Sequence, residues 1–167
     1  TVNPLPIATI AGTIATCKDA IAPDITITGA VGTAPYIFTY TINGGTNQTV
    51  TTISGNNVSV AAPATIAGIF TYTLVNVQDA SSTTCSQTQS GNATITVNPL
   101  PTATISGTTE VCENATSPDI TFTGAAGTAP YTFTYTINGT PQPPVTTITG
   151  NSVSISASTN TAGLFTV

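Results

Sequence analysis

Positive charge is almost absent from this sequence. The 167 residues include a single Lys or Arg, which is Lys18, no His and six acidic residues, so the formal net charge is −5. Nucleic-acid binding takes most of its affinity from Lys and Arg side chains that neutralise phosphates, and attraction to an anionic membrane also needs a basic cluster. We therefore exclude nucleic acid as a partner and expect no electrostatic attachment to membranes.

The absence of His also removes the common active sites. Ser/His/Asp and Cys/His nucleophile systems and His-based zinc sites cannot be built. The charged residues that could still cluster form two groups, Lys18-Asp19 with Asp24, and Glu110 and Glu113 with Asp119. Asp24 and Asp119 each follow a Pro, where a carboxylate commonly accepts hydrogen bonds from backbone N–H groups in a turn. We expect no enzyme, no cofactor and no metal site; the open alternative is calcium held by Asp and backbone oxygens.

Long apolar runs are missing too, and none approaches the roughly 18 residues of a membrane-spanning helix. Helix-forming residues are scarce, whereas Thr, Val, Ile, Tyr and Phe alternate with period two, which is typical of half-buried strands. The sequence therefore predicts an all-β protein without membrane insertion. In the first half the predicted strands are Ala8 to Ala11, Asp24 to Gly29, Tyr36 to Asn43, Val50 to Ser54, Asn57 to Ala61, Gly68 to Val77 and Ala93 to Val97.

One stretch, TVNPLP, occurs twice, at residues 1–6 and again at 96–101. Aligned at a constant offset of 95 without gaps, 45 of the 72 overlapping positions are identical. This tandem repeat predicts two domains, 1–95 and 96–167, the second stopping before its last strand. We expect the chain to be a window of a longer array. Seven short strands in a unit of about 95 residues predict an immunoglobulin-like β-sandwich.

Alternation along the strands assigns a core face to each unit, because residues two apart point to the same side of a strand. In the first unit the expected core residues are Ile25, Ile27, Tyr36, Phe38, Tyr40, Ile42, Val58, Val60, Phe70, Tyr72 and Leu74. In the second unit they are Ile120, Phe122, Tyr131, Phe133, Tyr135, Ile137, Val153 and Ile155.

The repeated hexapeptide is interpreted as the joint between units. Thr96 and Val97 are expected to complete the last strand of the first unit, after which Asn98, Pro99, Leu100 and Pro101 cross to the second. A residue before Pro is pushed to an extended conformation and Pro itself has a fixed φ, so a joint with two Pro and no Gly should be stiff.

Three cysteines make an odd number, and the repeat suggests a reason. Cys17 and Cys85 lie in one unit, while Cys112 corresponds to Cys17. The expected pairing is a Cys17–Cys85 disulfide, with Cys112 bonded to a residue beyond the chain end, which would imply an oxidising compartment. Three free thiols are the alternative.

Several motifs together resemble the tandem immunoglobulin-like repeats of very large Bacteroidota surface proteins, including gliding-motility-type adhesins. They are TVNPLPTATISG, VCENATSPDITFTGAAGTAPYTFTYTING, SGNNVSV and AGIFTYTLVNVQDA followed by Cys85. The resemblance covers the whole chain and implies secretion, often by the type IX route, and display in long stalks. One departure from antibody-type domains is that Cys17 precedes the strand at Asp24, so the expected disulfide should staple one end of the sandwich.

These observations favour a structural role, as a repeat of an extracellular stalk or filament of a bacterial surface adhesin. Its partners would be neighbouring repeats of the same chain or neighbouring subunits. The alternative is a binding module whose repeats contact a glycan, ice or another cell. Its candidate surface is a grid of Thr side chains on adjacent strands, although Thr is also common on any exposed strand face. The Thr pairs are Thr39 and Thr41, Thr71 and Thr73, and Thr94 and Thr96.

Overall fold

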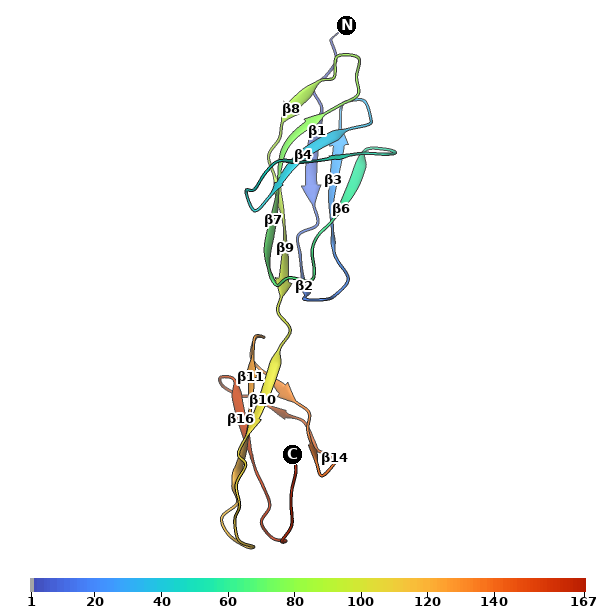
Figure 1. The fold of residues 1–167 in the computed structure, drawn as a ribbon. Coiled ribbons are helices and arrows are strands. Elements are labelled where there is room, and N and C mark those ends of the chain that lie inside the picture. The colour runs from blue at the N-terminus through green and yellow to red at the C-terminus, as the bar shows by residue number, and fades with distance from the viewer. Residues whose placement is uncertain (1) are drawn as a thin grey trace. The chain divides into compact units, whose positions relative to one another are not determined.

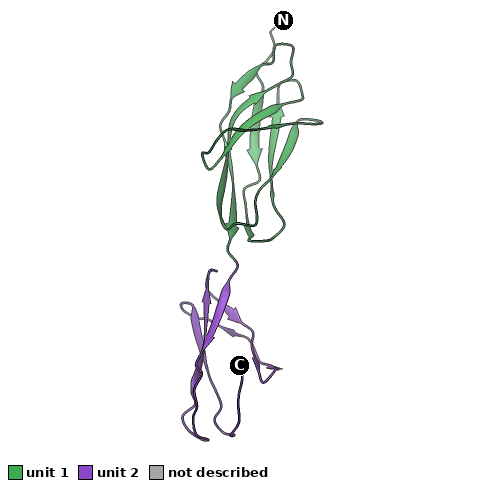
Figure 2. Ribbon diagram, viewed as in Figure 1, with its two compact units in different colours: residues 1–99 green, residues 100–167 purple. Residues whose placement is uncertain are grey.

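The computed structural model describes residues 2–167, which form strands and connecting loops (Figure 1). The chain divides into two compact units, residues 1–99 and residues 100–167 (Figure 2). The all-β prediction is confirmed. Among the described residues, no helix is long and apolar enough to cross a membrane.

Unit 1 consists of two sheets that enclose one core. The first sheet has the order β1-β3-β6, and the second has the order β2-β9-β7-β4-β5, with β8 pairing to β7. The arrangement is consistent with a β-sandwich. Its strands are β1 (Ile7–Ala11), β2 (Ile14–Cys17), β3 (Asp24–Ala30), β4 (Ile37–Ile42), β5 (Gln48–Thr51), β6 (Asn57–Ala61), β7 (Gly68–Gln78), β8 (Ser86–Thr88) and β9 (Asn92–Asn98).

The core of unit 1 lies between the two sheets. Ile25 and Ile27 of β3 contribute from one side, and Phe38, Tyr72 and other aromatic and aliphatic residues contribute from the other. The predicted core face is confirmed: Ile25, Ile27, Tyr36, Phe38, Tyr40, Tyr72 and Leu74 are buried, and Ile42, Val58, Val60 and Phe70 are half-buried against them. Strand β9 adds three residues that the sequence analysis did not assign to the core, Ala93, Ile95 and Val97.

The seven strands predicted for the first unit all form, within three residues at either end. Strands β2 and β8 were not predicted. Strand β2 has no period-two alternation and only one partner, β9, to which it pairs in parallel with Ile14 opposite Ile95. The chain leaves the first sheet for the second between β1 and β2, at Gly12, which has a φ of +117°. A Cβ there would lie 2.6 Å from the Asp24 carbonyl oxygen, so this crossing requires Gly.

Unit 2 repeats the first sheet of unit 1 and only part of the second. Its three-stranded sheet has the order β10-β11-β16, and the remaining strands form two separate pairs, β12-β15 and β13-β14. The strands are β10 (Thr102–Ser106), β11 (Asp119–Ala125), β12 (Thr132–Phe133), β13 (Thr136–Ile137), β14 (Thr140–Pro141), β15 (Val145–Thr146) and β16 (Ser152–Ser156).

The core of unit 2 is correspondingly small. Phe122, Tyr131 and Phe133 are its buried residues, with Ile120, Tyr135, Val145, Val153, Ile155 and Val167 half-buried against them. All were predicted except Val145 and Val167, whereas the predicted Ile137 is half-buried outside this cluster. The repeat frame starts at Thr96, but β9 continues pairing with β7 through Val97. The structural boundary therefore falls after Pro99, four residues beyond the sequence boundary at 95.

Candidate functional site

The acidic groups singled out in the sequence do not converge on a site. Lys18 and Asp19 form an exposed ion pair with an Nζ–Oδ2 distance of 2.7 Å, which contributes little to stability. Asp119 accepts a hydrogen bond from the Ser156 hydroxyl at 3.0 Å rather than from a turn N–H. Within residues 2–167, no three His, Cys, Asp or Glu side chains come together as metal ligands.

One carboxylate is buried, and no role was predicted for it from the sequence. Asp79 is 4% exposed, and its carboxylate accepts hydrogen bonds from the Thr33 N–H at 3.1 Å and from the Ser81 hydroxyl at 2.7 Å. It thereby joins the loop after β3 to the loop after β7. A Cβ on Gly32 would lie 2.7 Å from Oδ2, so the loop backbone lies directly against the carboxylate.

The balance of two effects sets the protonation of Asp79. Burial raises its pKa, but hydrogen bonds from the Ser81 hydroxyl and from the backbone of Thr33, Ser81 and Cys85 favour the ionised form and leave the pKa below its ordinary value. Asp79 is therefore a structural brace for two loops at one end of unit 1.

The predicted Cys17–Cys85 disulfide is wrong: Cys17, Cys85 and Cys112 are all free thiols. Cys17 pairs with Asn98 at the end of β9, close to where Gly68 begins β7. Cys85 precedes Ser86, which pairs with Gln78 at the opposite end of β7. Ten steps of about 3.3 Å put the two cysteines roughly 33 Å apart, whereas a disulfide needs Cα atoms within about 7 Å. The parallel pairing of β2, which the sequence does not reveal, carries Cys17 to the far end.

The Thr residues of the hypothetical binding grid do lie on adjacent strands. Thr41 pairs with Thr73, and Thr71 pairs with Thr94, so β4, β7 and β9 carry them side by side. All six are half-buried. Hydroxyl pairs also occur in unit 2, where Thr121 and Ser154 lie 2.8 Å apart and Thr123 and Ser152 lie 3.0 Å apart. These hydroxyls are already hydrogen-bonded to one another.

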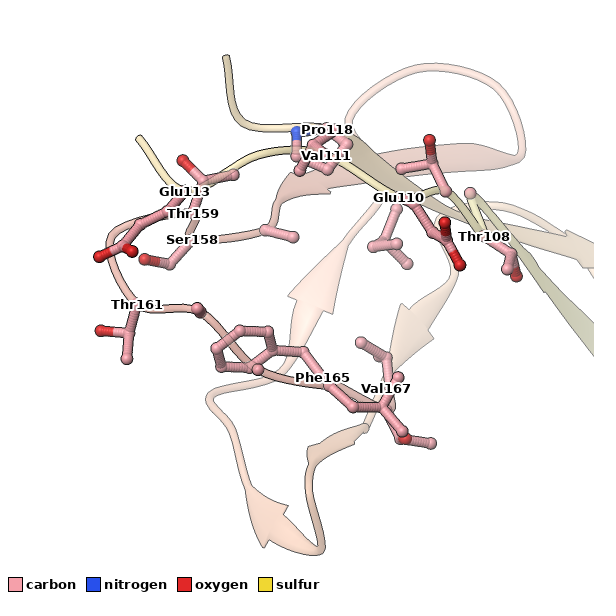
Figure 3. A pocket seen from close by; sticks show the side chains of 18 of the residues that line it. Thr108, Glu110, Val111, Glu113, Pro118, Ser158, Thr159, Thr161, Phe165 and Val167 are labelled. Carbon is pink, nitrogen blue, oxygen red and sulfur yellow. The ribbon is translucent and has the colours of Figure 1, made fainter. Parts of the chain in front are cut away.

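A groove of about 780 Å³ lies in unit 2. Figure 3 shows Phe165 and Val167, on the C-terminal segment, facing Glu110 and Val111 across it. Pro118, Thr159 and Ile120 line it as well. In the repeat, Phe165 and Val167 correspond to Phe70 and Tyr72 of β7, and Glu110 and Val111 correspond to Ala15 and Thr16 of β2. In unit 1 all four counterparts pair with β9. The groove is thus the place that β9 occupies in unit 1.

Two pairs of docking residues were missed, although the repeat could have revealed them. Asn43 and Asn138 each fix a distant segment by side-chain hydrogen bonds. Thr52 and Thr147 are buried, and each accepts a hydrogen bond at 2.9 Å from the N–H of a core Tyr, Tyr36 or Tyr131. Each pair is identical at an offset of 95 and lies in a short identical stretch, TING at 41–44 and 136–139 or VTTI at 50–53 and 145–148, while residues 45–49 differ from residues 140–144. That identity was the available signal.

No protein-family model matches the chain, and neither a curated protein nor a solved structure shows significant similarity to it.

Proposed function

We propose that this chain is a structural segment of an extracellular stalk or filament of a bacterial surface adhesin, built from immunoglobulin-like repeats of about 95 residues. The observation that carries the proposal is the repeat itself, 45 identities in 72 positions, each copy with its own core. Tandem duplication of a small sandwich makes the protein longer, and this is the change expected for a structural repeat. In this proposal its partners are neighbouring repeats.

The packing of the residues on either side of the joint supports a stiff connection between the units. Strand β9 stays paired to β7 as far as Val97, so the first unit is ordered up to the start of the joint. At the other side, a Cβ on Gly127 would lie 3.0 Å from Pro101 Cβ, which shows that Pro101 packs onto the body of unit 2. Pro6 is buried against Gly32 in the same manner. Only Pro99 and Leu100 then lie between ordered parts, and Pro99 has a fixed φ.

The near absence of Lys and Arg suits an extracellular location, because trypsin-like proteases would find one cleavage site. Because the chain has so few charges, its stability should also depend little on salt concentration. These features and the resemblance to Bacteroidota surface repeats support the location; the cysteines no longer do, since they are free.

Small-angle scattering of the 167-residue chain tests the proposal. We expect a narrow range of maximum dimension for the unmodified chain and a broader one for Pro99→Gly. Pro143→Gly, in an exposed loop of unit 2, is the matched control and should leave the scattering unchanged. An unmodified chain as variable as Pro99→Gly would refute a stiff stalk.

A binding module remains the second candidate, because hydroxyl groups are ordered on the face of β11 and β16. Co-sedimentation with insoluble polysaccharide and measurement of ice-growth inhibition test it. A loss of binding in Thr121→Val and Thr123→Val would support this function.

A further inference from the structure

We propose that the outer edge of strand β6 is a self-association surface, at which two copies of this chain pair β6 against β6 in antiparallel orientation. Strand β6 is the last strand of the sheet β1-β3-β6 in unit 1, the unit that contains β1 to β9. Of the described strands, none lies on its outer side (Figure 1). An edge strand presents a row of unpaired N–H and C=O groups, which is a template for pairing with another chain.

The register of β6 on β3 shows which backbone groups are free. In an antiparallel pair, successive residues direct their N–H and C=O groups alternately toward the neighbouring strand and away from it. The Ala62 N–H donates to the Pro23 carbonyl oxygen at 2.9 Å. At the other end, the Asn56 carbonyl oxygen accepts a hydrogen bond from the Gly29 N–H at 2.7 Å. The even-numbered residues thus bond to β3, and the outward groups belong to Asn57, Ser59 and Ala61.

These outward groups have no other partner in the molecule. Within residues 2–167, neither a loop nor a side chain forms a hydrogen bond to the backbone of Asn57, Ser59 or Ala61. All three residues are exposed. The edge is therefore available to a strand from outside the chain.

Unit 2 has the same free edge on β16. The Ala157 N–H donates to the Pro118 carbonyl oxygen at 2.8 Å, which sets the same alternation as in β6. The backbone groups directed outward are those of Ser152, Ser154 and Ser156. Strands β6 and β16 differ at three of five positions, yet neither contains a charged residue or Pro. The free, uncharged edge is thus common to both units.

Two other edges are protected in ways that β6 is not. At β1, the Ala8 N–H donates to Gln89 Oε1 at 3.0 Å, so a side chain of the same unit covers part of that edge. At β5, the counterpart of Thr49 in unit 2 is Pro144, which has no N–H to donate. Coverage and Pro are common means of preventing association at sheet edges. Both are absent from β6 and β16.

Charge and symmetry favour a second copy of the chain as the partner of β6. The chain has a net charge of −5, but no charged residue lies on β6. A partner strand should also be uncharged, because a charged side chain would lose water there without gaining an ionic partner. When two β6 strands pair about Ser59, Asn57 of each copy lies opposite Ala61 of the other. The free groups of one strand then meet those of the other, and each such residue pair exchanges two hydrogen bonds.

The same register also matches the side chains. Val58 and Val60 are half-buried against the core of unit 1. In the proposed pair, Val58 of one copy lies opposite Val60 of the other, at a closely spaced position without hydrogen bonds. Contact between these side chains would cover their exposed parts and extend the core across the interface. Val153 and Ile155 have the equivalent places in unit 2.

An exposed Ile precedes each of the two edge strands. Ile53 is 100% exposed and its counterpart Ile148 is 97% exposed, each four residues before its strand. Figure 1 shows the loop between β5 and β6 projecting beyond β6. A partner strand along β6 would come close to this loop, and burial of Ile53 would favour association. The surface would pair two copies whether or not the chain is part of a stalk.

Disulfide trapping tests the register. Cys17, Cys85 and Cys112 are first replaced by Ser, and one Cys is then introduced into β6. Ser59→Cys should give a disulfide-linked dimer under mild oxidation, because this residue lies opposite itself with Cα atoms about 5.5 Å apart. Asn57→Cys and Ala61→Cys, at positions that are also exposed, should each give little dimer alone, whereas a mixture of the two should cross-link. Equal yields from all three single variants would overturn the proposal.

Sedimentation velocity over a wide range of chain concentrations tests the association itself. We expect a dimer fraction that rises with concentration. Ser59→Lys, combined with Ser154→Lys to block the edge of unit 2, should weaken association by about tenfold or more, because two Lys side chains would face each other across the interface. Thr9→Lys with Thr104→Lys adds the same charge at exposed positions of β1 and β10 and should associate like the unmodified chain. A chain that stays monomeric, or equal association of the two double variants, would overturn the proposal.

Discussion

Asn43 binds the segment that begins β7: its Oδ1 accepts a hydrogen bond from the Thr71 N–H at 2.7 Å, and its Nδ2 donates to the Ile69 carbonyl oxygen at 3.2 Å. Asn138 makes the equivalent bonds to Thr166 and Leu164 at 2.8 and 3.2 Å. Both Asn residues have positive φ, 51° and 49°, and precede a Gly in a tight turn. A single residue therefore adopts the turn conformation with its backbone and holds the neighbouring segment with its side chain.

The first prediction separates these two roles in unit 1. Asn43→Gly keeps the backbone conformation, because Gly accepts positive φ, but removes both side-chain bonds. We expect a loss of about 1–2 kcal/mol in the free energy of unfolding, measured by chemical denaturation. Asn43→Ala should lose more, since it also strains the turn. Equal stability of Asn43→Gly and the unmodified chain would contradict the docking role.

A second prediction concerns Asp79 and acid. Its pKa is lowered in the folded protein, so its contribution to stability is present above the ordinary value of 3.8 and disappears as the pH falls below that value through the folded pKa. Thermal unfolding of the chain between pH 2 and 7 should therefore show a loss of stability of unit 1 at low pH. Asp79→Asn should be less stable near neutral pH and lose less on acidification. Asp24→Asn, which removes an exposed carboxylate of the same unit, is the control and should keep the steep acid dependence.

The third prediction concerns the cysteines. All three thiols should react with a thiol reagent in the folded protein without prior reduction. Cys17 and Cys112 are exposed and should react quickly, whereas Cys85 is half-buried, with its Sγ 3.1 Å from Thr83 Oγ1, and should react more slowly. Reducing agent should leave the melting temperature unchanged. A protected Cys17–Cys85 pair would show that the strand register at β2 is wrong.

A fourth prediction uses two Gly residues with positive φ. Gly12→Ala would place a Cβ 2.6 Å from the Asp24 carbonyl oxygen at the crossing between sheets. Clash and backbone strain together should cost about 3 kcal/mol of unfolding free energy. Gly44→Ala also falls at a positive φ, but at +68°, in the left-handed region, and with nothing within 4 Å of the added Cβ, so it should cost only about 1 kcal/mol. Similar losses for both variants would mean that the crossing is not tightly packed.

Much of unit 1 was predictable because alternation marks its long strands directly. Tyr36 to Asn43 and Gly68 to Val77 place aromatic residues on one face, and these residues form the observed core. Strand β2 escaped because Ile14–Cys17 is stabilised by its distant partner β9 and has no local pattern of its own. The cysteine error follows from that omission, since β2 decides which end of the unit Cys17 reaches.

In unit 2, too, local sequence pattern is not enough to predict strands. Thr109 to Cys112 and Gly163 to Val167 resemble the strands of unit 1 in sequence, yet neither is a strand without the counterpart of β9. Local pattern predicts where a strand can form, but pairing decides whether it does. The position of the groove therefore follows from the repeat alignment together with strand pairing, and not from the residue types of these two segments.

Distance measurement between two spin labels tests the central claim, a stiff joint between repeated units, most directly. One label is attached at Cys17 on β2 and the other at Ser106→Cys on β10, with Cys85→Ser and Cys112→Ser to remove the other thiols. We expect a single narrow distance distribution that broadens clearly when Pro99→Gly is added. A distribution that is already as broad with Pro99 in place would contradict the stalk.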